Sequence, residues 1–504
     1  MKKTVLCLVL ALTLLCSVPA AAQPQEAYNW YEVFVYSFKD SDGDGIGDLR
    51  GLTRKLDYIR GLGFTALWLM PIMPSPSYHK YDVTDYYGID PQYGTLEDAR
   101  ALVAACRERG MRLIIDLPLN HSSTQHPWFL EAAQALRDGR TEHPRVDWYH
   151  FTQEPEKNYV RLPGTDWYYE EQFQGGGMPD LNVDNASLRA EIVSILDFWL
   201  NDVGVDGFRL DAVTSFYTGD DDSNIAFLHF LKETCEALKP GSFLVGECWA
   251  GLPTIARYYE SGIDSFFLFP ASQAEGYIAA TLRARKPAQT FINHLQRLQS
   301  AIPEGILTPF LSNHDTGRTV GLVQGRQAPE RVKFAHALLS LLGGYTFTYY
   351  GEEVGMAGAG EDPNKRLGMP WAPDDITSPP PGVTREEYPY PDVAAQQADP
   401  FSILNYIRTL NTQRLDLPEV ALGQTEVHQA SDDTCVIIRQ YQGRAVWIAV
   451  NFSPKASRDL RLGARLKALH VLDVGETVTT VTADSQGTLV RLAPYGIAYL
   501  GPAD

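Results

Sequence analysis

The sequence predicts an α/β protein built on a parallel (β/α)8 barrel, with a small domain inserted after the third strand and a C-terminal β-sandwich. Three observations predict this fold. Short apolar runs alternate with amphipathic helical patterns along most of the chain. One interval rich in aromatic residues, Gly and Pro interrupts that alternation. The last part of the chain contains only strand-like runs, which is typical of an all-β domain.

The barrel is predicted from eight apolar runs with strand character. They occupy residues 30–38, 64–72, 112–119, 207–211, 243–248, 265–269, 306–312 and 346–353. Helical patterns lie between them, and residues 96–110 show apolar residues at helical spacing with Gly110 as the expected C-cap. Eight strand–helix units of this kind are typical of a TIM barrel.

These patterns divide the chain into four parts. The barrel is expected to take residues 23–120 and 186–416, and the interrupting interval, 121–185, is expected to form the inserted domain. A third domain, a β-sandwich, is expected over 417–504, where alternating apolar residues recur in several short runs.

Residues 1–22 read as a secretory signal peptide. Lys2 and Lys3 precede an apolar run, and Ala20–Ala22 offer small residues for cleavage. We therefore expect a secreted protein, extracellular or periplasmic. A lipoprotein anchor at Cys16 is disfavoured because Leu15 directly precedes it. No later segment reaches the roughly 20 apolar residues that a membrane span needs.

The composition limits the kinds of molecule that the protein is expected to bind. The formal net charge of the chain is −19, so its surface is expected to repel nucleic acid and anionic membranes and to suit neutral substrates or cations. Four widely separated cysteines remain after the signal and form no dense framework, so no disulfide pairing is assigned. A monomer is the working expectation.

The stretch KDSDGDGIGDLRGL predicts a structural calcium site. Its expected ligands are the carboxylates of Asp40, Asp42, Asp44 and Asp48 and the backbone carbonyl of Ile46, at alternate positions of an EF-hand-like loop. Gly51 stands where a sensor needs a bidentate glutamate, and the run upstream has strand character. We therefore expect a calcium clip that stabilises the fold; the alternative is a solvated acidic turn.

Polar residues follow several of the predicted strands. In a (β/α)8 barrel the chemistry lies at the C-terminal ends of the strands, and three carboxylates fall there: Asp211, Glu247 and Asp315. Each alone could be a helix N-cap or a satisfied polar group. As an ordered set they are consistent with a carboxylate pair acting on an acetal, with a third group orienting the sugar.

The motifs DLPLNH, GFRLDAVTS, GECW and LSNHD, in this order along nearly the whole mature chain, resemble those of the α-amylase family, glycoside hydrolase family 13. MPDLN resembles a fifth motif, in the form seen in a group intermediate between oligo-1,6-glucosidases and neopullulanases. The resemblance implies a retaining glycosidase with a structural calcium loop after the first strand.

The same resemblance implies a role for individual residues. Asp211 would be the nucleophile, Glu247 the general acid/base, and Asp315 the group that stabilises the distorted sugar. The implied substrate-binding residues are Tyr81, Asp82, His121, Arg209 and His314. Tyr81 would be the stacking platform for the sugar at the cleavage site, and Arg209 would keep Asp211 ionised.

We expect cleavage of internal α-1,4 bonds of starch and maltodextrins. Alternatives are an α-glucosidase or oligo-1,6-glucosidase, and a cyclomaltodextrinase or neopullulanase. After Asp211 the chain reads Ala-Val-Thr-Ser, where typical α-amylases often carry a Lys-His pair against the leaving sugar, so preference on that side stays open. A non-catalytic glucan-binding protein is the remaining alternative, disfavoured because all three carboxylates are present.

Overall fold

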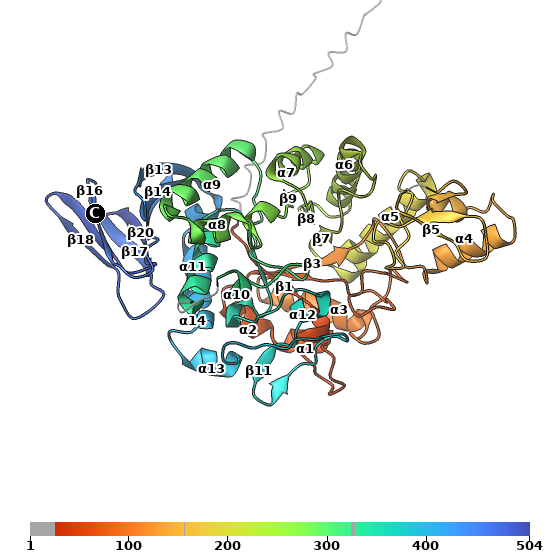
Figure 1. Cartoon of the computed structure of the whole chain (residues 1–504), viewed down its shortest axis with the longest axis horizontal. Coiled ribbons are helices and arrows are strands. Elements are labelled where there is room, and N and C mark those ends of the chain that lie inside the picture. Colours follow the sequence, from red (N-terminus) through yellow and green to blue (C-terminus); the bar gives the residue numbers. More distant parts are fainter. Residues whose placement is uncertain (1–25, 156, 324–327, 504) are drawn as a thin grey trace, which may run out of the picture.

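The computed structural model describes residues 26–155, 157–323 and 328–503, so the predicted signal peptide lies outside the described residues. Its centre is a curved parallel sheet with strand order β10-β1-β2-β3-β7-β8-β9 (Figure 1). These strands are β1 (Asn29–Val33), β2 (Ala66–Leu69), β3 (Arg112–Leu117), β7 (Gly207–Leu210), β8 (Phe243–Gly246), β9 (Ser265–Phe266) and β10 (Thr346–Tyr349).

The eighth position of the barrel is held by two isolated bridges instead of a continuous strand. Thr308 pairs in parallel with Phe267, and Phe310 pairs in parallel with Phe347 of β10, so this segment joins the two ends of the sheet. Pro309 stands between them and has no N–H to donate, which limits regular ladder pairing here. The predicted (β/α)8 barrel is confirmed.

The first strand is shorter than the sequence pattern predicts. The apolar run 30–38 continues past β1, but residues Val35–Ser37 form a 3-10 turn. The chain turns here because its backbone binds another segment: the Phe38 carbonyl accepts hydrogen bonds from Trp371 Nε1 (2.7 Å) and Thr377 Oγ1 (3.1 Å). An apolar run that is buried on every side does not reveal where its strand ends.

Helices surround the sheet. Those of the barrel are α1 (Leu49–Arg54), α2 (Leu56–Gly61), α3 (Leu96–Glu108), α5 (Ala186–Asp197), α6 (Asp221–Leu238), α7 (Leu252–Tyr258), α8 (Tyr277–Arg283), α9 (Pro287–Ala301), α10 (Thr319–Leu322), α11 (Ala328–Ser340) and α14 (Ile403–Asp416). α3 begins at a capping box between Thr95 and Asp98, and Gly110 follows its end in the left-handed conformation (φ 63°).

Inside the barrel, side chains form layers. Trp30, Ile114 and Val245 belong to one buried apolar layer. Because side chains of a strand alternate between its faces, the residues two positions further along, Glu32, Asp116 and Glu247, face the same interior nearer the carboxyl ends. The interior is therefore apolar at one level and carries charged groups at the level above it.

Residues 121–185 form a small unit beside the carboxyl end of β3. They contain α4 (Pro127–Arg137) and a three-stranded antiparallel sheet of β4 (Phe151–Thr152), β6 (Tyr168–Glu170) and β5 (Tyr159–Arg161). Asn185 then caps α5, its side chain accepting from the backbone N–H groups of Ser187 and Leu188. Figure 1 shows this unit at the opposite end of the molecule from the C-terminal sheets.

The C-terminal part contains two antiparallel sheets. One has the order β13-β14-β15-β20-β17 and the other β16-β19-β18. Their bounds are β13 (Gln424–Ala430), β14 (Thr434–Tyr441), β15 (Arg444–Asn451), β16 (Arg458–Leu462), β17 (Leu466–Leu472), β18 (Thr480–Asp484), β19 (Gly487–Leu492) and β20 (Ile497–Pro502). Val436 of the first sheet and Val490 of the second share one apolar core, which confirms the predicted sandwich.

The long segment between β10 and α14 contains the short elements α12 (Asp362–Lys365), β11 (Pro370–Ala372), β12 (Asp375–Ile376) and α13 (Val393–Ala398), and α15 (Pro418–Leu422) follows α14. All four cysteines of the described residues are buried and unpaired. Within the same residues, no helix is both long enough and apolar enough to cross a membrane.

Candidate active site

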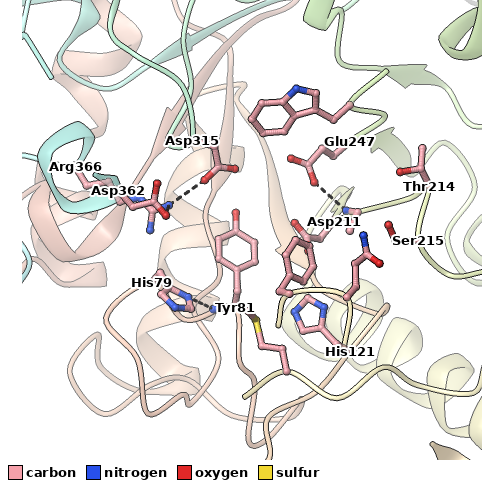
Figure 2. A pocket seen from close by; sticks show the side chains of 15 residues that line it. His79, Tyr81, His121, Asp211, Thr214, Ser215, Glu247, Asp315, Asp362 and Arg366 are labelled. Atoms are coloured by element: carbon pink, nitrogen blue, oxygen red, sulfur yellow. Dashed lines mark hydrogen bonds and ion pairs between the residues drawn. The ribbon is translucent and has the colours of Figure 1, made fainter. Parts of the chain in front are cut away.

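A cavity of about 490 Å³ opens at the carboxyl ends of the barrel strands. Asp211, Glu247 and Asp315, which lie far apart in the sequence, all line it (Figure 2). Asp211 follows β7 directly, Glu247 follows β8, and Asp315 follows the bridging segment that contains Phe310. The barrel therefore brings the three predicted carboxylates together in one place.

Arg209 lies beneath this cavity and connects the carboxylates. Its side chain is fully buried, and its Nη1 donates hydrogen bonds to Asp211 Oδ1 and to Asp116 Oδ1, the latter at 2.9 Å. Its Nη2 lies 2.9 Å from Glu247 Oε1. One guanidinium thus compensates several acidic groups, and it holds the side chains of Asp211 and Glu247 on the same side of the barrel mouth.

Glu247 is held in a protonated state near neutral pH. Burial above all, with the charges of Asp211 and Asp315, raises its pKa to about 8 against the opposing effect of Arg209. The backbone N–H of Ala212 donates to Glu247 Oε2 at 2.9 Å. Ala212 has a positive φ of 45°, so the residue directly after Asp211 carries backbone strain that aims its N–H at the neighbouring carboxyl group.

Asp315 is ionised, in contrast to Glu247. His314 lies 3.0 Å from Asp315 Oδ2 through its Nε2. Arg366 Nη2 donates to Asp315 Oδ1 at 3.0 Å (Figure 2). These two cations hold the pKa of Asp315 far below its usual range although burial opposes them. His314 in turn bonds Glu32 through Nδ1 (2.6 Å), and the two acidic neighbours raise the pKa of this buried histidine to about 9.

Tyr81 completes this group. Its hydroxyl donates to Asp116 Oδ2 at 2.9 Å and lies 2.7 Å from His314 Nε2, and its ring stacks on the imidazole with centroids 5.5 Å apart. The preceding residue, Lys80, is buried at a left-handed φ of 66° and pairs with Asp90 Oδ2 at 2.8 Å. The ring of Tyr81 therefore lies on the cavity wall with both its hydroxyl and its backbone held.

The predicted substrate-binding residues fall into two groups. Tyr81 and His121 line the cavity itself. Arg209 and His314 are fully buried and contact the carboxylates that line the cavity. Asp82 is buried and accepts hydrogen bonds from Ser75 Oγ (2.6 Å) and Ser77 Oγ, so its carboxylate organises the loop that carries Tyr81.

Sequence reasoning missed Glu32, Asp116 and Arg366. Glu32 and Asp116 each interrupt an otherwise apolar strand run, and a charged residue in such a run is the signal that could have identified them. Arg366 lies in the long segment after β10, where no local pattern indicates that it reaches Asp315. These three residues supply partners for His314, Arg209 and Asp315.

The comparisons with known proteins agree with this geometry. Residues 32–420 match the α-amylase catalytic domain. The chain belongs to the α-amylase family of glycoside hydrolases. It is 38% identical, over 80% of each chain, to alpha-amylase 3 of Dictyoglomus thermophilum, and 35% identical to glucan 1,6-alpha-glucosidase of Streptococcus pneumoniae over 65% of this chain and 64% of that protein. Among solved structures, Eubacterium rectale Amy13B aligns with a TM-score of 0.90 at 40% identity, over 95% of this chain and 96% of that one.

As an α-amylase family enzyme, this protein places few charged groups at the side of the cavity that carries Thr214 and Ser215 (Figure 2). Two aromatic residues that line the cavity are partly exposed: Trp249 at 52% and Phe173 at 41%. Trp249 comes from the segment after β8, whereas Phe173 comes from the unit inserted after β3 and lies 5.4 Å from the ring of His121.

The acidic loop after β1 brings three predicted metal ligands together. Oxygen atoms of Asp40, Asp42 and Asp48 lie within 4.8 Å of one another, a spacing that three ligands of one cation can adopt. Asp44 lies in the same loop, and its Oδ1 accepts the Ile46 N–H at 2.7 Å; it is not a member of this cluster. The donor set of hard carboxylate oxygens fits calcium.

Proposed function

We propose that this enzyme is a secreted α-amylase that cleaves internal α-1,4-glucosidic bonds of starch and maltodextrins with retention of configuration. One observation carries the proposal: Asp211 and Glu247, on neighbouring strand ends, share Arg209 and face one cavity with Asp315. The first relative named above is an alpha-amylase, which supports the choice of substrate.

The chemistry follows from the different environments of the carboxyl groups. Asp211, in contact with Arg209, attacks the anomeric carbon, while protonated Glu247 donates its proton to the glycosidic oxygen and the leaving chain departs. Deprotonated Glu247 then removes a proton from water, which releases the covalent intermediate with net retention. Retention predicts a separation of about 5–5.5 Å between the two carboxyl groups.

The neighbouring residues support this cycle. Asp315, which His314 and Arg366 keep ionised, would accept hydrogen bonds from hydroxyl groups of the distorted sugar. The ring of Tyr81 would pack against the apolar face of the same sugar. Because these groups are held by buried partners before substrate arrives, little reorganisation is needed during the reaction.

A parallel digest tests the proposal. Soluble starch, isomaltooligosaccharides, pullulan and cyclodextrin are incubated with the enzyme, and the products are separated by chain length. Mixed maltooligosaccharides from starch, with the α-anomer formed first in a proton NMR time course, are expected. Glucose as the only product, or a β-anomer first, would contradict the proposal.

The second candidate is an α-glucosidase or oligo-1,6-glucosidase. It is favoured by the similarity to glucan 1,6-alpha-glucosidase and by the absence of a Lys-His pair after Asp211. Release of glucose from isomaltooligosaccharides would support it. Rapid opening of cyclodextrin would instead support the cyclomaltodextrinase alternative.

We also propose that the loop with Asp40, Asp42 and Asp48 binds a structural Ca²⁺, with Asp44 and the Ile46 carbonyl as further candidates from the same loop. Bound calcium would neutralise the crowded carboxylates there. The loop contacts the segment after β10, where Ser378 N donates to Gly45 O at 3.0 Å and Lys39 pairs with Asp375 at 2.6 Å. A cation would therefore stabilise two distant parts of the barrel mouth together.

A further inference from the structure

Glu32, His314 and Asp315 form a row of three ionisable groups that leads from the barrel interior to the catalytic cavity. Glu32 on β1 and His314 are fully buried, whereas Asp315 lines the cavity. We propose that Glu32 is a positioning residue for the reaction: it holds the imidazole of His314 as a cation, and this cation keeps Asp315 ionised and in place. The inference rests on the proposed function and deepens it.

The contacts of His314 are all satisfied when its imidazole carries two protons. Its Nδ1 lies 2.6 Å from Glu32 Oε1, so this nitrogen donates to a carboxylate. Its Nε2 lies 3.0 Å from Asp315 Oδ2 and 2.7 Å from the Tyr81 hydroxyl. That hydroxyl donates its one proton to Asp116 Oδ2 at 2.9 Å, so its oxygen is left to accept from Nε2. In this arrangement both nitrogens donate, which makes the imidazole a cation.

The charge of Glu32 opposes the effect of burial on His314. Burial lowers the pKa of the histidine, but Asp315 and Glu32 together raise it to about 9. Burial also raises the pKa of Glu32, and the hydrogen bond from His314 opposes that rise. Removing the charge of Glu32 should therefore lower the pKa of His314. The other charged or titratable groups close to this pair are Tyr81, Asp116, Arg209, Tyr349 and Arg366.

The barrel fixes the orientation of both side chains. Glu32 pairs in register with Tyr349 of β10 and with Trp68 of β2. The ring of Trp68 packs edge-on against the imidazole of His314, with centroids 5.6 Å apart. The backbone N–H of His314 also donates to Glu32 Oε1, at 3.4 Å. A rotation of the imidazole that takes Nε2 away from Asp315 would therefore break its bond to Glu32 as well.

The charge of His314 is measured by NMR of the enzyme with isotope-labelled histidine, the signal being assigned by its absence from His314→Asn. At about pH 7 the wild-type imidazole should show two protonated nitrogens. A neutral imidazole would overturn the inference. In Glu32→Gln, which keeps the shape of the side chain and removes its charge, His314 should titrate at lower pH than in the wild type. An unchanged titration would also overturn the inference.

The pH profile of activity tests the consequence for the reaction. kcat/KM is measured at about pH 6 and pH 8 with a glucosyl fluoride, whose departure needs no proton from Glu247. The ratio of Glu32→Gln to wild type should fall about tenfold between these values, through kcat, because the variant loses the imidazolium as the pH rises. The matched control is Glu353→Gln. Glu353 is also fully buried, but it accepts hydrogen bonds from Tyr31 (2.6 Å) and Tyr58 (2.9 Å), so its ratio should not change with pH.

The outcomes separate this inference from the proposed function. A wild type that hydrolyses no α-glucan overturns the proposed function and, with it, the role of Glu32 in the reaction. An active wild type, with a Glu32→Gln variant that loses the same fraction of activity at both pH values, overturns the inference alone, because a merely structural role predicts that result. Glu32→Asp, which keeps the charge, should restore part of the wild-type profile. If Glu32→Gln lowers the folded fraction seen by circular dichroism, the wild-type titration decides: a pKa of His314 near the ordinary value of about 6.5 overturns the inference, and one well above it supports the inference.

Discussion

The two ends of the catalytic cavity are built differently. At the end with Asp315 and Arg366, charged and polar groups bond one another in a buried network, in which His314 reaches Glu32 and Tyr81 reaches Asp116. At the side with Thr214 and Ser215, these two lining side chains are uncharged and half-buried (Figure 2). Buried partners hold the groups of the first end in place before substrate arrives, as the proposed mechanism requires. We therefore expect the conserved chemistry of the family to reside at the first end, and substrate preference to depend on the second.

The sharpest test of this contrast is Glu247→Gln, which keeps the shape of the side chain and removes its proton transfer. Activity on starch should fall by at least about 10³-fold, since both protonation of the leaving group and activation of water are lost. Steady-state hydrolysis measures this, and mass spectrometry with an activated glucosyl fluoride should reveal a covalent adduct on Asp211. Starch hydrolysis that is unchanged in this variant would disprove the assignment of the acid/base.

A second test addresses the rigidity of the network end. Lys80→Met should lower the free energy of unfolding by about 3 kcal/mol, because it leaves the buried carboxylate of Asp90 without its cation. Urea denaturation measures this. The control is Arg161→Ala, whose partner Asp166 is exposed, for which a loss below about 1 kcal/mol is expected. Equal losses of unfolding free energy in the two variants would show that the buried Lys80–Asp90 pair stabilises the fold no more than an exposed pair does.

The pH dependence of activity is the third test. Glu247 must be protonated to act as the acid, and its pKa is raised to about 8, so kcat/KM should fall about tenfold per pH unit above that value. The contribution of Glu247 to the free energy of unfolding also falls with rising pH, because the folded state holds the proton more tightly than the unfolded state. This contribution is fully present below pH 4.5 and is lost as the pH rises through about 8. A glucosyl fluoride, which needs no proton for departure, should show a weaker alkaline limb; identical limbs for both substrates would refute the mechanism.

A smaller effect is expected for Phe173, which the inserted unit contributes to the cavity wall beside His121. Phe173→Ala should raise KM for maltooligosaccharides about 3- to 5-fold and change kcat less, because the ring contributes contact area without touching the reacting atoms. Initial rates over a substrate series measure the two constants separately. A loss confined to kcat would show that Phe173 also takes part in the chemical step.

Calcium removal is expected to have the smallest effect, and on stability. Chelation should lower Tm by about 2–5 °C, because a ligand bound only to the folded state stabilises it. Calorimetry with added chelator, followed by restored Ca²⁺, makes the measurement. The Asp40→Asn, Asp42→Asn variant should melt at a temperature that chelator does not change. A wild type equally insensitive to chelator would count against the calcium proposal.

Local patterns were sufficient for much of this protein. Apolar runs and helical spacing predict the barrel and the sandwich because burial imposes periods that any window of sequence displays. The order of polar residues at strand ends predicts Asp211, Glu247 and Asp315 because parallel strands all end at one face. The alternation of side chains along a strand also predicts that Arg209, two residues before Asp211, faces the same interior.

Only the tertiary structure decided which groups meet. Arg366 bonds Asp315 and Glu32 bonds His314, each between segments distant in sequence, and Trp249 lines two cavities. A residue's protonation state depends on such neighbours and on burial, so two carboxyl groups of similar intrinsic acidity came to differ: Glu247 keeps its proton near neutral pH and Asp315 does not.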